Sequence, residues 1–397
     1  MTLHDASLAG PGPWAGISTA AIAHNLAWLR RRVQTAGAQA GAGGGAGGAP
    51  GSPPRLWAVV KADAYGHGLH HALAAAGAAD GVCVSDLDDA WRVRRQGWQQ
   101  PVLVLSAWGL RADTLRDPAL GELHVVIDDP ATLHTIASAA PGLPQLHVWL
   151  RHAGHLYTLG FAGTAYTDAF QRLHARAQAG ALAGVGHLHH YAAAENADTL
   201  AVERQAFATA AAGLPGPHCT GNSAALCGGA AIPVHAQDQW LRCGLALYGA
   251  SALPGVTGPQ LGLRPAMSLR ARLLNVQHVA PGQTVGYGGS FRATQATCIG
   301  VVGIGYGHGV PRQLWQRGGV LAGRHGRRVP LAGRVAMDCL TVDLGAAPPE
   351  APGDIITLWG HAPGGACLPV EEAAQACDTI AAELLTGLTA RTPLITE

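Results

Sequence analysis

Short apolar runs alternate with stretches of helical pattern through the first two thirds of this 397-residue chain. Eight runs are long enough for one strand each: Leu56 to Val60, Gly81 to Val84, Val102 to Leu105, Leu123 to Ile127, Leu146 to Leu150, Val185 to Leu188, His218 to Gly221 and Leu241 to Tyr248. Apolar strands separated by helices are typical of parallel sheets. Eight repeats of the unit predict an α/β fold, a (β/α)8 TIM-type barrel over residues 14–255.

A helix is expected before the first of these strands, from Ile17 to Val33, with Ser18 or Thr19 as its N-cap. An Ala- and Gly-rich stretch, residues 36–54, follows it and has too few large apolar side chains to bury a core. We interpret this stretch as a flexible insertion. Because it connects a helix to the next strand, it should lie opposite the catalytic face of the barrel and be dispensable for catalysis.

The pattern changes from about Leu261 onward, where Gly and Pro interrupt β-rich runs. Four strands are predicted here: Met267 to Val279, Thr297 to Val302, Arg328 to Ala336 and Asp354 to Leu358. A short helix from Pro369 to Leu385 should pack on them. Residues 256–397 therefore predict a second, mostly β domain.

Composition narrows the possible classes of protein. The apolar fraction of 48% and the net charge of +1 suit a soluble globular chain, and there is no basic excess for binding nucleic acid or an anionic membrane. The first residues, up to Trp14, have no signal-peptide pattern, and no apolar stretch is long enough to span a membrane. The eight cysteines show no Cys-x-x-Cys pair, which favours reduced thiols and a cytoplasmic location.

Lys61 is the only lysine in the chain, whereas the other 25 of its 26 Lys and Arg residues are arginines. Arginine replaces lysine wherever a positive charge is enough, but a guanidinium does not shed its proton to become a nucleophile. Lys61 is therefore a candidate for Schiff-base chemistry. It falls just past a predicted strand, as do His190, Asn222-Ser223 and Gly244-Leu245, where the catalytic groups of such barrels lie.

The residues around this lysine, Val59-Val60-Lys61-Ala62-Asp63-Ala64-Tyr65-Gly66-His67-Gly68, resemble the pyridoxal-phosphate lysine segment of the alanine racemases, a fold type III family. Weaker matches follow in the same order, so that the resemblance spans roughly residues 14–393. It implies a pyridoxal 5'-phosphate (PLP) enzyme acting on a small amino acid. The leading hypothesis is an alanine racemase.

The resemblance also implies a cofactor site. Lys61 would bind the cofactor aldehyde and act as a base, and the Tyr65 hydroxyl would reach the phosphate. Ser223, Gly244 and Leu245 would cradle the phosphate next to Asn222, and His190 would lie against the ring. Arg242 would face the pyridine nitrogen. Because arginine keeps its proton, it would leave that nitrogen unprotonated, which favours returning the α-proton over decarboxylation.

Three residues of the second half complete the resemblance. Tyr287 resembles the acid/base on the opposite face of the substrate, which a racemase needs because one base alone regenerates the starting enantiomer. The backbone N–H of Met337 would meet the substrate carboxylate, and Tyr306 would line the entrance. In the family the tyrosine acts on the partner subunit's lysine, so the resemblance implies a homodimer with shared active sites.

The sequence departs from the family at several positions. Arg151 stands where the family has a lysine that is often carbamylated, and Thr158 stands where it has the arginine that this carbamate orients toward the substrate carboxylate. Ala382 replaces a tyrosine that helps to hold the phosphate, and His308 replaces an aspartate. Losing one charge-assisted hydrogen bond costs about 1.5–3 kcal/mol, so the substrate clamp is altered while Lys61 and Tyr287 are kept.

Other functions remain open at this point. The altered clamp is compatible with a PLP-binding relative of weak or no activity, or with a broad-specificity racemase. A decarboxylase or aldolase on the same scaffold is disfavoured by Arg242. The pattern His187-x-His189, with His218, is also how metal-dependent hydrolases begin a zinc site, but no later carboxylate partner is evident, so no metal is expected.

Overall fold

The first half of the chain forms a closed barrel of eight parallel strands, which confirms the predicted fold class. The computed structural model describes residues 12–43, 54–107, 109–228, 239–323 and 325–397. The barrel strands are β2 (Arg55–Val59), β3 (Gly81–Val84), β4 (Val102–Val104), β5 (Leu123–Ile127), β6 (Leu143–Arg151), β7 (Leu182–Leu188), β8 (His218–Gly221) and β9 (Gln239–Cys243). Each pairs with the next in sequence, and β9 closes the barrel on β2.

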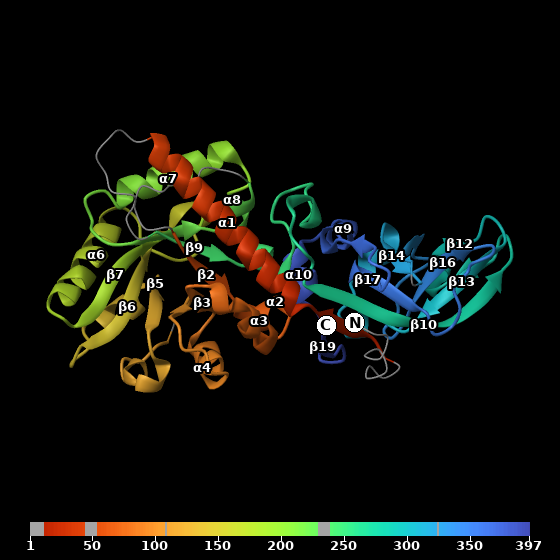
Figure 1. Cartoon of the computed structure of the whole chain (residues 1–397), viewed down its shortest axis with the longest axis horizontal. Helices are drawn as coiled ribbons and strands as arrows, with labels where there is room; N and C mark the ends of the chain where they lie inside the picture. The colour runs from red at the N-terminus through yellow and green to blue at the C-terminus, as the bar shows by residue number, and fades with distance from the viewer. Residues whose placement is uncertain (1–11, 44–53, 108, 229–238, 324) are drawn as a thin grey trace.

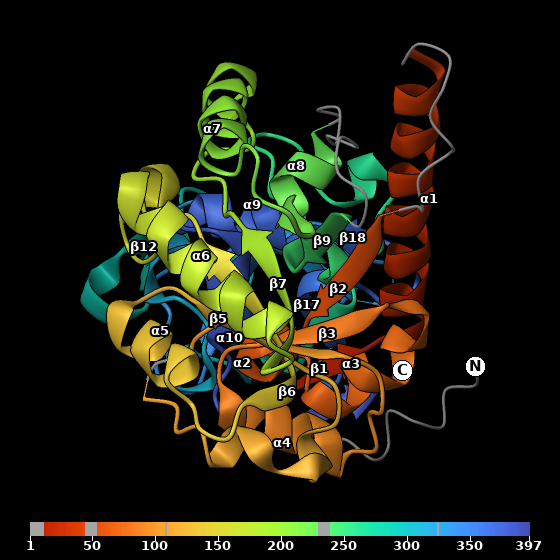
Figure 2. The ribbon, with the colours of Figure 1, turned by 90° about the vertical axis from the view of Figure 1, so that its left-hand side faces the viewer.

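Helices surround the barrel, as the end-on view in Figure 2 shows. They are α2 (Lys61–Tyr65), α3 (Leu69–Ala75), α4 (Leu87–Arg95), α5 (Pro130–Ala137), α6 (Gly163–Gln178), α7 (Ala197–Ala210) and α8 (Ser223–Cys227), with α1 (Thr19–Gly43) running before β2. The connection after β4 has two 3-10 turns, η3 (Thr114–Arg116) and η4 (Pro118–Leu120), in place of an α-helix. Apolar side chains fill the layer between strands and helices.

Tryptophan side chains fill the interior of the barrel. The rings of Trp57 and Trp240 stack 4.2 Å apart, and Trp149 contacts Trp240 edge to face. A Cβ at Gly186 would lie 2.6 Å from the Trp149 ring, so glycine makes room for the indole. Because strand residues two apart share a face, Arg242 follows Trp240 along the inside of β9. The tryptophan rings thus lie below the polar residues of the carboxyl-terminal mouth.

The second domain is built on a nine-stranded sheet that lies beside the barrel (Figure 1). Its strands are β1 (Trp14–Ile17), β10 (Met267–Val279), β13 (Thr297–Val302), β14 (Gly319–Ala322), β15 (Arg327–Pro330), β16 (Leu340–Gly345), β17 (Ile355–His361), β18 (Cys367–Leu368) and β19 (Leu394–Thr396). A separate hairpin joins β11 (Thr284–Val285) to β12 (Phe291–Arg292). Helices α9 (Val370–Ala376) and α10 (Ala381–Thr386) pack on the same apolar core.

The beginning of the predicted barrel domain belongs to the second domain instead. Residues Trp14–Ile17, all buried, form β1, which pairs with β10 and β19. The predicted helix starts only at Thr19, and Ser18 caps it, since its hydroxyl accepts from the Ala21 N–H at 3.2 Å. The helix then continues to Gly43, into the stretch predicted to be flexible, because alanine favours helix. The rest of that stretch, residues 44–53, lies outside the described residues.

Three other predicted elements end early or divide. The strand predicted to reach Tyr248 ends at Cys243 and gives way to a 3-10 turn, η6 (Leu245–Tyr248). The helix predicted over 369–385 is two helices, α9 and α10, with Asp378 between them at a φ of 56°, a conformation that aspartate tolerates. The strand predicted over 328–336 ends at Pro330, since proline cannot donate to the ladder.

Among the described residues, no helix combines the length and the apolar character needed to cross a bilayer.

Buried neutral histidines should make the fold sensitive to acid. His67 is fully buried, and desolvation lowers its pKa to about 4 from the ordinary 6.5. The unfolded chain therefore takes up this proton first as the pH falls from 6.5 to 4, and the free energy of unfolding decreases, by about 3 kcal/mol for this residue. Urea titrations at several pH values should show this slope. His67→Asn, which keeps a donor in the Nδ1 position, should flatten it, whereas the exposed His134→Gln should not; equal slopes in all three proteins would contradict the assignment.

Candidate active site

Lys61 begins α2 directly after β2, at the mouth of the barrel, and the backbone that follows it is unusual. Four consecutive residues, Ala62 to Tyr65, have φ angles between 50° and 58°, a left-handed turn that side chains disfavour. Hydrogen bonds hold it: the Gly66 N–H donates to the Ala62 carbonyl at 3.0 Å, and the Gly68 N–H donates to the Asp63 carbonyl at 2.9 Å. Strained backbone of this kind is typical of functional sites.

The strained turn places Tyr65 against the end of β9. The Tyr65 hydroxyl oxygen lies 2.5 Å from the position that a Cβ on Gly244 would occupy, and the Tyr65 ring stacks on Tyr248 at 5.2 Å. Burial raises the pKa of Tyr65 to about 12. The hydroxyl therefore keeps its proton and is able to donate to an anion.

Backbone N–H groups converge beside this hydroxyl. The N–H groups of Gly244 and Ala246 donate to the Ser223 hydroxyl at 3.1 and 3.3 Å. Asn222 caps α8, because its side-chain oxygen accepts from the Ala225 N–H at 3.0 Å, and this fixes Ser223 at the helix start. Ala246, which the sequence did not single out, thus supplies a donor next to the predicted Leu245. Converging N–H and hydroxyl groups of this kind form an anion cradle.

If the cradle holds the phosphate of the PLP that the resemblance implies, substituting Gly244 should weaken PLP binding strongly. In Gly244→Ala the new methyl group would displace the Tyr65 hydroxyl and fill the cradle. Losing one charge-assisted phosphate contact should raise the Kd for PLP about tenfold or more, measured by titrating the apoprotein. Gly77→Ala is the matched control, since its Cβ would meet open space. An unchanged Kd in Gly244→Ala would place the phosphate elsewhere.

Arg242 is buried beneath the mouth, and its guanidinium is held from several sides. Nη1 donates to the Cys219 carbonyl at 2.9 Å and contacts the Cys219 thiol at 3.0 Å. Nη2 donates to the His189 carbonyl at 2.9 Å and to Nδ1 of His190 at 3.2 Å. These contacts fix the guanidinium in one orientation.

His190 is held neutral by its surroundings. Desolvation, together with the positive charges of Arg242, Arg151 and Lys61, lowers its pKa to about 3. A neutral ring is able to accept from Arg242 through Nδ1, which leaves its other nitrogen as the donor. The structure therefore brings the predicted residues Lys61, Arg242 and His190 together at one end of the barrel.

The two altered positions of the substrate clamp contact each other. Nη2 of Arg151, the last residue of β6, donates to the Thr158 hydroxyl at 3.2 Å. Nη1 of Arg151 lies 3.6 Å from a carboxylate oxygen of Asp128, which is buried just past β5. Asp128 was not identified from the sequence. The sequence did contain a signal for it, because Asp128 directly follows a predicted barrel strand.

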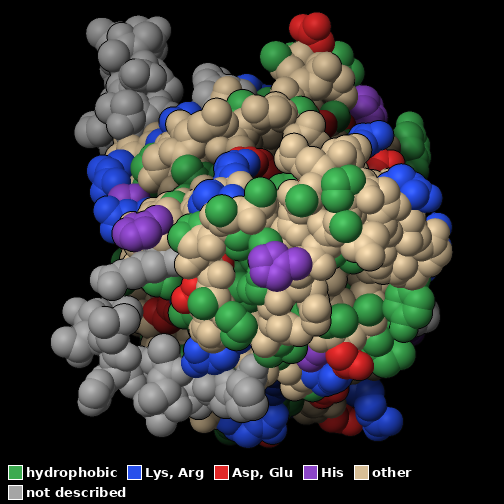
Figure 3. Space-filling model, turned by 90° about the vertical axis from the view of Figure 1, so that its right-hand side faces the viewer, with side chains coloured by type: hydrophobic (Ala, Val, Ile, Leu, Met, Phe, Trp, Pro, Cys, Tyr) green, Lys and Arg blue, Asp and Glu red, His purple; other side chains and the backbone are tan. Residues whose placement is uncertain are grey.

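Of the predicted residues of the second domain, Tyr287 lies away from the barrel mouth of the same chain. Tyr287 sits in the turn between β11 and β12, at the end of the second domain remote from α2 (Figure 1). Tyr306 and Met337 lie in adjoining loops, because the Tyr306 N–H bonds the Ala336 carbonyl and the Gly307 N–H bonds the Met337 carbonyl. All three side chains are exposed, Tyr287 by 69%. Figure 3 shows hydrophobic side chains spread over the far end of this domain.

Two other residues that differ from the family pattern, Ala382 and His308, are also located in the structure. Ala382 lies in α10, a helix that contacts α2, the segment that Lys61 begins. His308 is buried, and its Nδ1 accepts from the Gly305 N–H at 3.2 Å. Burial lowers the pKa of His308, so that a neutral ring closes the Tyr306 loop where an aspartate stands in the family.

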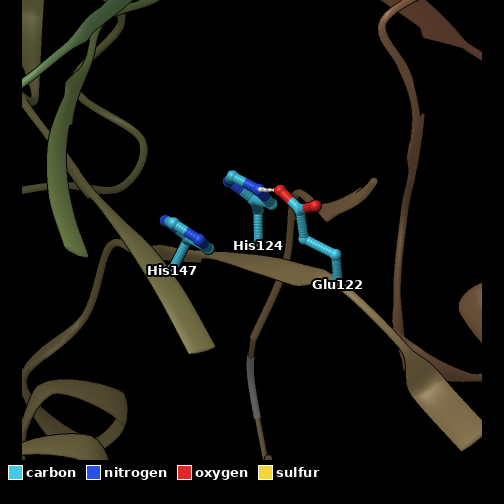
Figure 4. A group of neighbouring side chains, drawn as sticks. All are labelled: Glu122, His124 and His147. Carbon is cyan, nitrogen blue, oxygen red and sulfur yellow. Dashed lines mark hydrogen bonds and ion pairs between the residues drawn. The ribbon is translucent and has the colours of Figure 1, made fainter. Parts of the chain in front are cut away.

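The histidines of the suggested zinc pattern diverge. His187 and His218 lie close to each other, with ring centroids 5.1 Å apart, but Nδ1 of His187 lies 2.8 Å from the Tyr166 hydroxyl. His189 faces Glu203 instead. Over the described part of the chain, one group has metal-ligand spacing, and it consists of Glu122, His124 and His147 at the opposite end of the barrel (Figure 4).

The geometry of this second group does not suit a metal. The two imidazole rings stack in parallel, with centroids 4.3 Å apart and an interplanar angle of 8°. Nitrogen lone pairs lie in the ring plane, so parallel stacked rings cannot both point at one ion. His124 also bonds Glu122 at 3.0 Å and accepts from the Trp149 indole at 3.0 Å, which satisfies both of its nitrogens. The group is a stacked, hydrogen-bonded part of the barrel floor.

Comparison with known proteins supports one family over nearly the whole chain. The model of the alanine racemase N-terminal domain matches residues 48–252, and that of the C-terminal domain matches residues 266–396. The alanine racemase of Bordetella avium is 37% identical over 384 residues, covering 96% of this chain and 98% of its own.

Solved structures agree. The biosynthetic alanine racemase of Pseudomonas aeruginosa has a TM-score of 0.83 at 32% identity, covering 98% of this chain and all of its own. The structure of the Bartonella henselae alanine racemase, which holds covalently bound pyridoxal phosphate, has a TM-score of 0.78 and covers 98% of this chain and all of its own. At 22% identity, this likeness supports the fold alone. By its two domains and its full-length relatives, this chain belongs to the alanine racemase family.

Proposed function

We propose that this protein is a PLP-dependent racemase that interconverts L- and D-alanine. The single observation that carries the proposal is the arrangement at the barrel mouth, where the only lysine, an anion cradle and a fixed guanidinium lie at the ends of β2, β8 and β9. These three groups match the aldehyde, the phosphate and the pyridine nitrogen of one cofactor.

The residues present fit this cofactor by their own geometry. The N–H groups of Gly244 and Ala246 converge on the Ser223 hydroxyl, and the Tyr65 hydroxyl lies next to Gly244. Arg242 is held by carbonyl oxygens and by neutral His190, so it is a fixed proton donor that does not transfer its proton. Lys61 would bind the aldehyde, and His190 would lie against the ring.

The bound cofactor would draw electron density from the substrate α-carbon and so acidify its proton. Lys61 would hold or release a proton on one face of that carbon, and Tyr287 of the partner subunit would do so on the other. Two groups are needed because a single base returns the proton to the face from which it came. Arg242, by withholding its proton from the ring nitrogen, disfavours decarboxylation and transamination.

We propose a homodimer, which the position of Tyr287 supports. The turn that carries Tyr287 lies far from α2, the segment that Lys61 of the same chain begins (Figure 1). Several exposed large apolar side chains of the second domain, among them Leu274, Tyr287, Tyr306 and Met337, would be covered by a second copy. We place the enzyme in the cytoplasm, because its eight cysteines are free thiols.

The activity test is direct. Purified protein should show the visible absorption band of bound PLP and should exchange the α-proton of either alanine enantiomer in heavy water, with chiral chromatography recording both products. Protein that holds no PLP, or that interconverts neither enantiomer, would contradict the proposal.

A second candidate is a racemase of another or broader amino-acid specificity. The Arg151–Thr158 contact and the small Ala382 side chain favour it, because both lie where the resemblance places substrate or phosphate contacts. Profiling the chiral amino acids of proteins by chiral chromatography separates the two, since this candidate requires faster racemisation of an amino acid other than alanine.

A further inference from the structure

Arg151 stands at the carboxyl end of β6, and not all of its N–H groups make hydrogen bonds. Its Nη2 donates to the Thr158 hydroxyl at 3.2 Å, and its Nη1 lies 3.6 Å from Asp128. Its Nε is buried and makes no hydrogen bond among the described residues. A guanidinium has five N–H donors, so this one has room for a further acceptor.

The other cations of the mouth are already committed. The terminal nitrogens of Arg242 are held by Cys219, His189 and His190, and its remaining N–H is assigned to the cofactor ring. Lys61 is needed for the cofactor aldehyde, and the phosphate has its own cradle at Ser223. Arg151 is near enough to these groups to depress the pKa of His190, and Arg242 in turn contributes to lowering the pKa of Arg151. Within the described part of the chain, Arg151 is therefore a cation at the mouth beyond the needs of the cofactor.

Asp128 and Thr158 act on this cation as orienting groups. Asp128 is almost fully buried, and burial raises the pKa of its carboxyl group. At 3.6 Å it attracts the Arg151 guanidinium without forming a close two-bond pair. The Thr158 hydroxyl holds the other terminal nitrogen, and the Gly160 N–H, two residues on, donates to the Asp128 carbonyl at 2.7 Å, which ties this loop to β5.

We propose that Arg151 binds the carboxylate of the amino-acid substrate, with Asp128 and Thr158 positioning its guanidinium. This inference rests on the proposed function. The cation that binds the carboxylate is then Arg151, the last residue of β6. In the family it is the arginine at the position of Thr158, in the loop that follows. The orienting anion of Arg151 is an encoded carboxylate, so substrate binding should not depend on bicarbonate, as it would where a lysine must be carbamylated.

Propionate is the probe, because it carries the carboxylate but no amine to react with the cofactor. Isothermal titration of the PLP-loaded wild type should give a measurable Kd for propionate that is unaffected by bicarbonate, and propionamide should bind more weakly. In Arg151→Gln the Kd should rise about tenfold or more, the cost of a lost charge-assisted hydrogen bond. Arg172→Gln, an exposed arginine of α6, is the matched control and should leave it unchanged.

Two further variants test the inference independently, in case Arg151→Gln misfolds. Arg151→Lys keeps the charge but loses the two-pronged donor, so its Kd for propionate should rise severalfold. Asp128→Asn should raise it as well, since the guanidinium loses its orienting charge.

The outcomes separate this inference from the function on which it rests. If PLP-loaded Arg151→Gln and Arg151→Lys bind propionate like the wild type, or if the wild type does not distinguish propionate from propionamide, the inference is overturned while the racemase proposal stands. A wild-type protein that takes up no PLP overturns the proposed function, and this inference with it.

Discussion

Lys61→Arg should reduce racemisation by about a thousandfold or more, although it preserves the positive charge. A guanidinium neither attacks an aldehyde nor gives up its proton near neutral pH, so both roles of Lys61 are lost at once. The visible band of bound cofactor should disappear with the activity. Borohydride reduction, which should fix a pyridoxyl group on the wild-type protein, should leave no label in the variant.

The composition of the chain makes this experiment unusually clear. Because Lys61 is the only lysine, a labelled lysine peptide from the wild type identifies the residue without ambiguity. The double variant Lys61→Arg with Arg172→Lys restores one lysine at an exposed site of α6 and is the control. Label on that double variant, or full activity in Lys61→Arg, would exclude Lys61 as the cofactor lysine.

Mixing two inactive variants should restore activity. Tyr287→Phe alone should lower racemisation by about a hundredfold or more, since it removes the proton donor of one face. When Lys61→Arg and Tyr287→Phe subunits are dissociated together and reassembled, one site of each mixed dimer joins an intact Lys61 to Tyr287 of the partner subunit. Random pairing should restore about a quarter of the wild-type activity.

The mixing experiment has a sharp control. Mixing Lys61→Arg with a double variant that carries both substitutions should restore nothing, because no pairing then builds a complete site. Activity that fails to return in the first mixture, although mass measurements show mixed dimers, would mean that the two residues act within one chain or not together.

Much of the fold was predictable because its signals are local. The barrel strands have continuous apolar runs, and four of them begin at the predicted residue: Gly81–Val84, Val102–Val104, Leu123–Ile127 and His218–Gly221. Two strands of the second domain, Met267–Val279 and Thr297–Val302, do so as well. The β1 strand was missed because four buried residues next to a helix carry no pattern of their own. Their partners, β10 and β19, lie more than two hundred residues away, and only the assembled sheet identifies them.

The sequence by itself determined the barrel, the single reactive amine and the residue types around it, because each depends on residue identity or on short-range spacing. Only the tertiary structure decided which groups share a contact. It joined Arg151 to Asp128 and Thr158, added Ala246 to the cradle, and separated Tyr287 from Lys61 of its own chain. Contacts between strand ends depend on how the barrel closes, and closure is a property of all eight strands together.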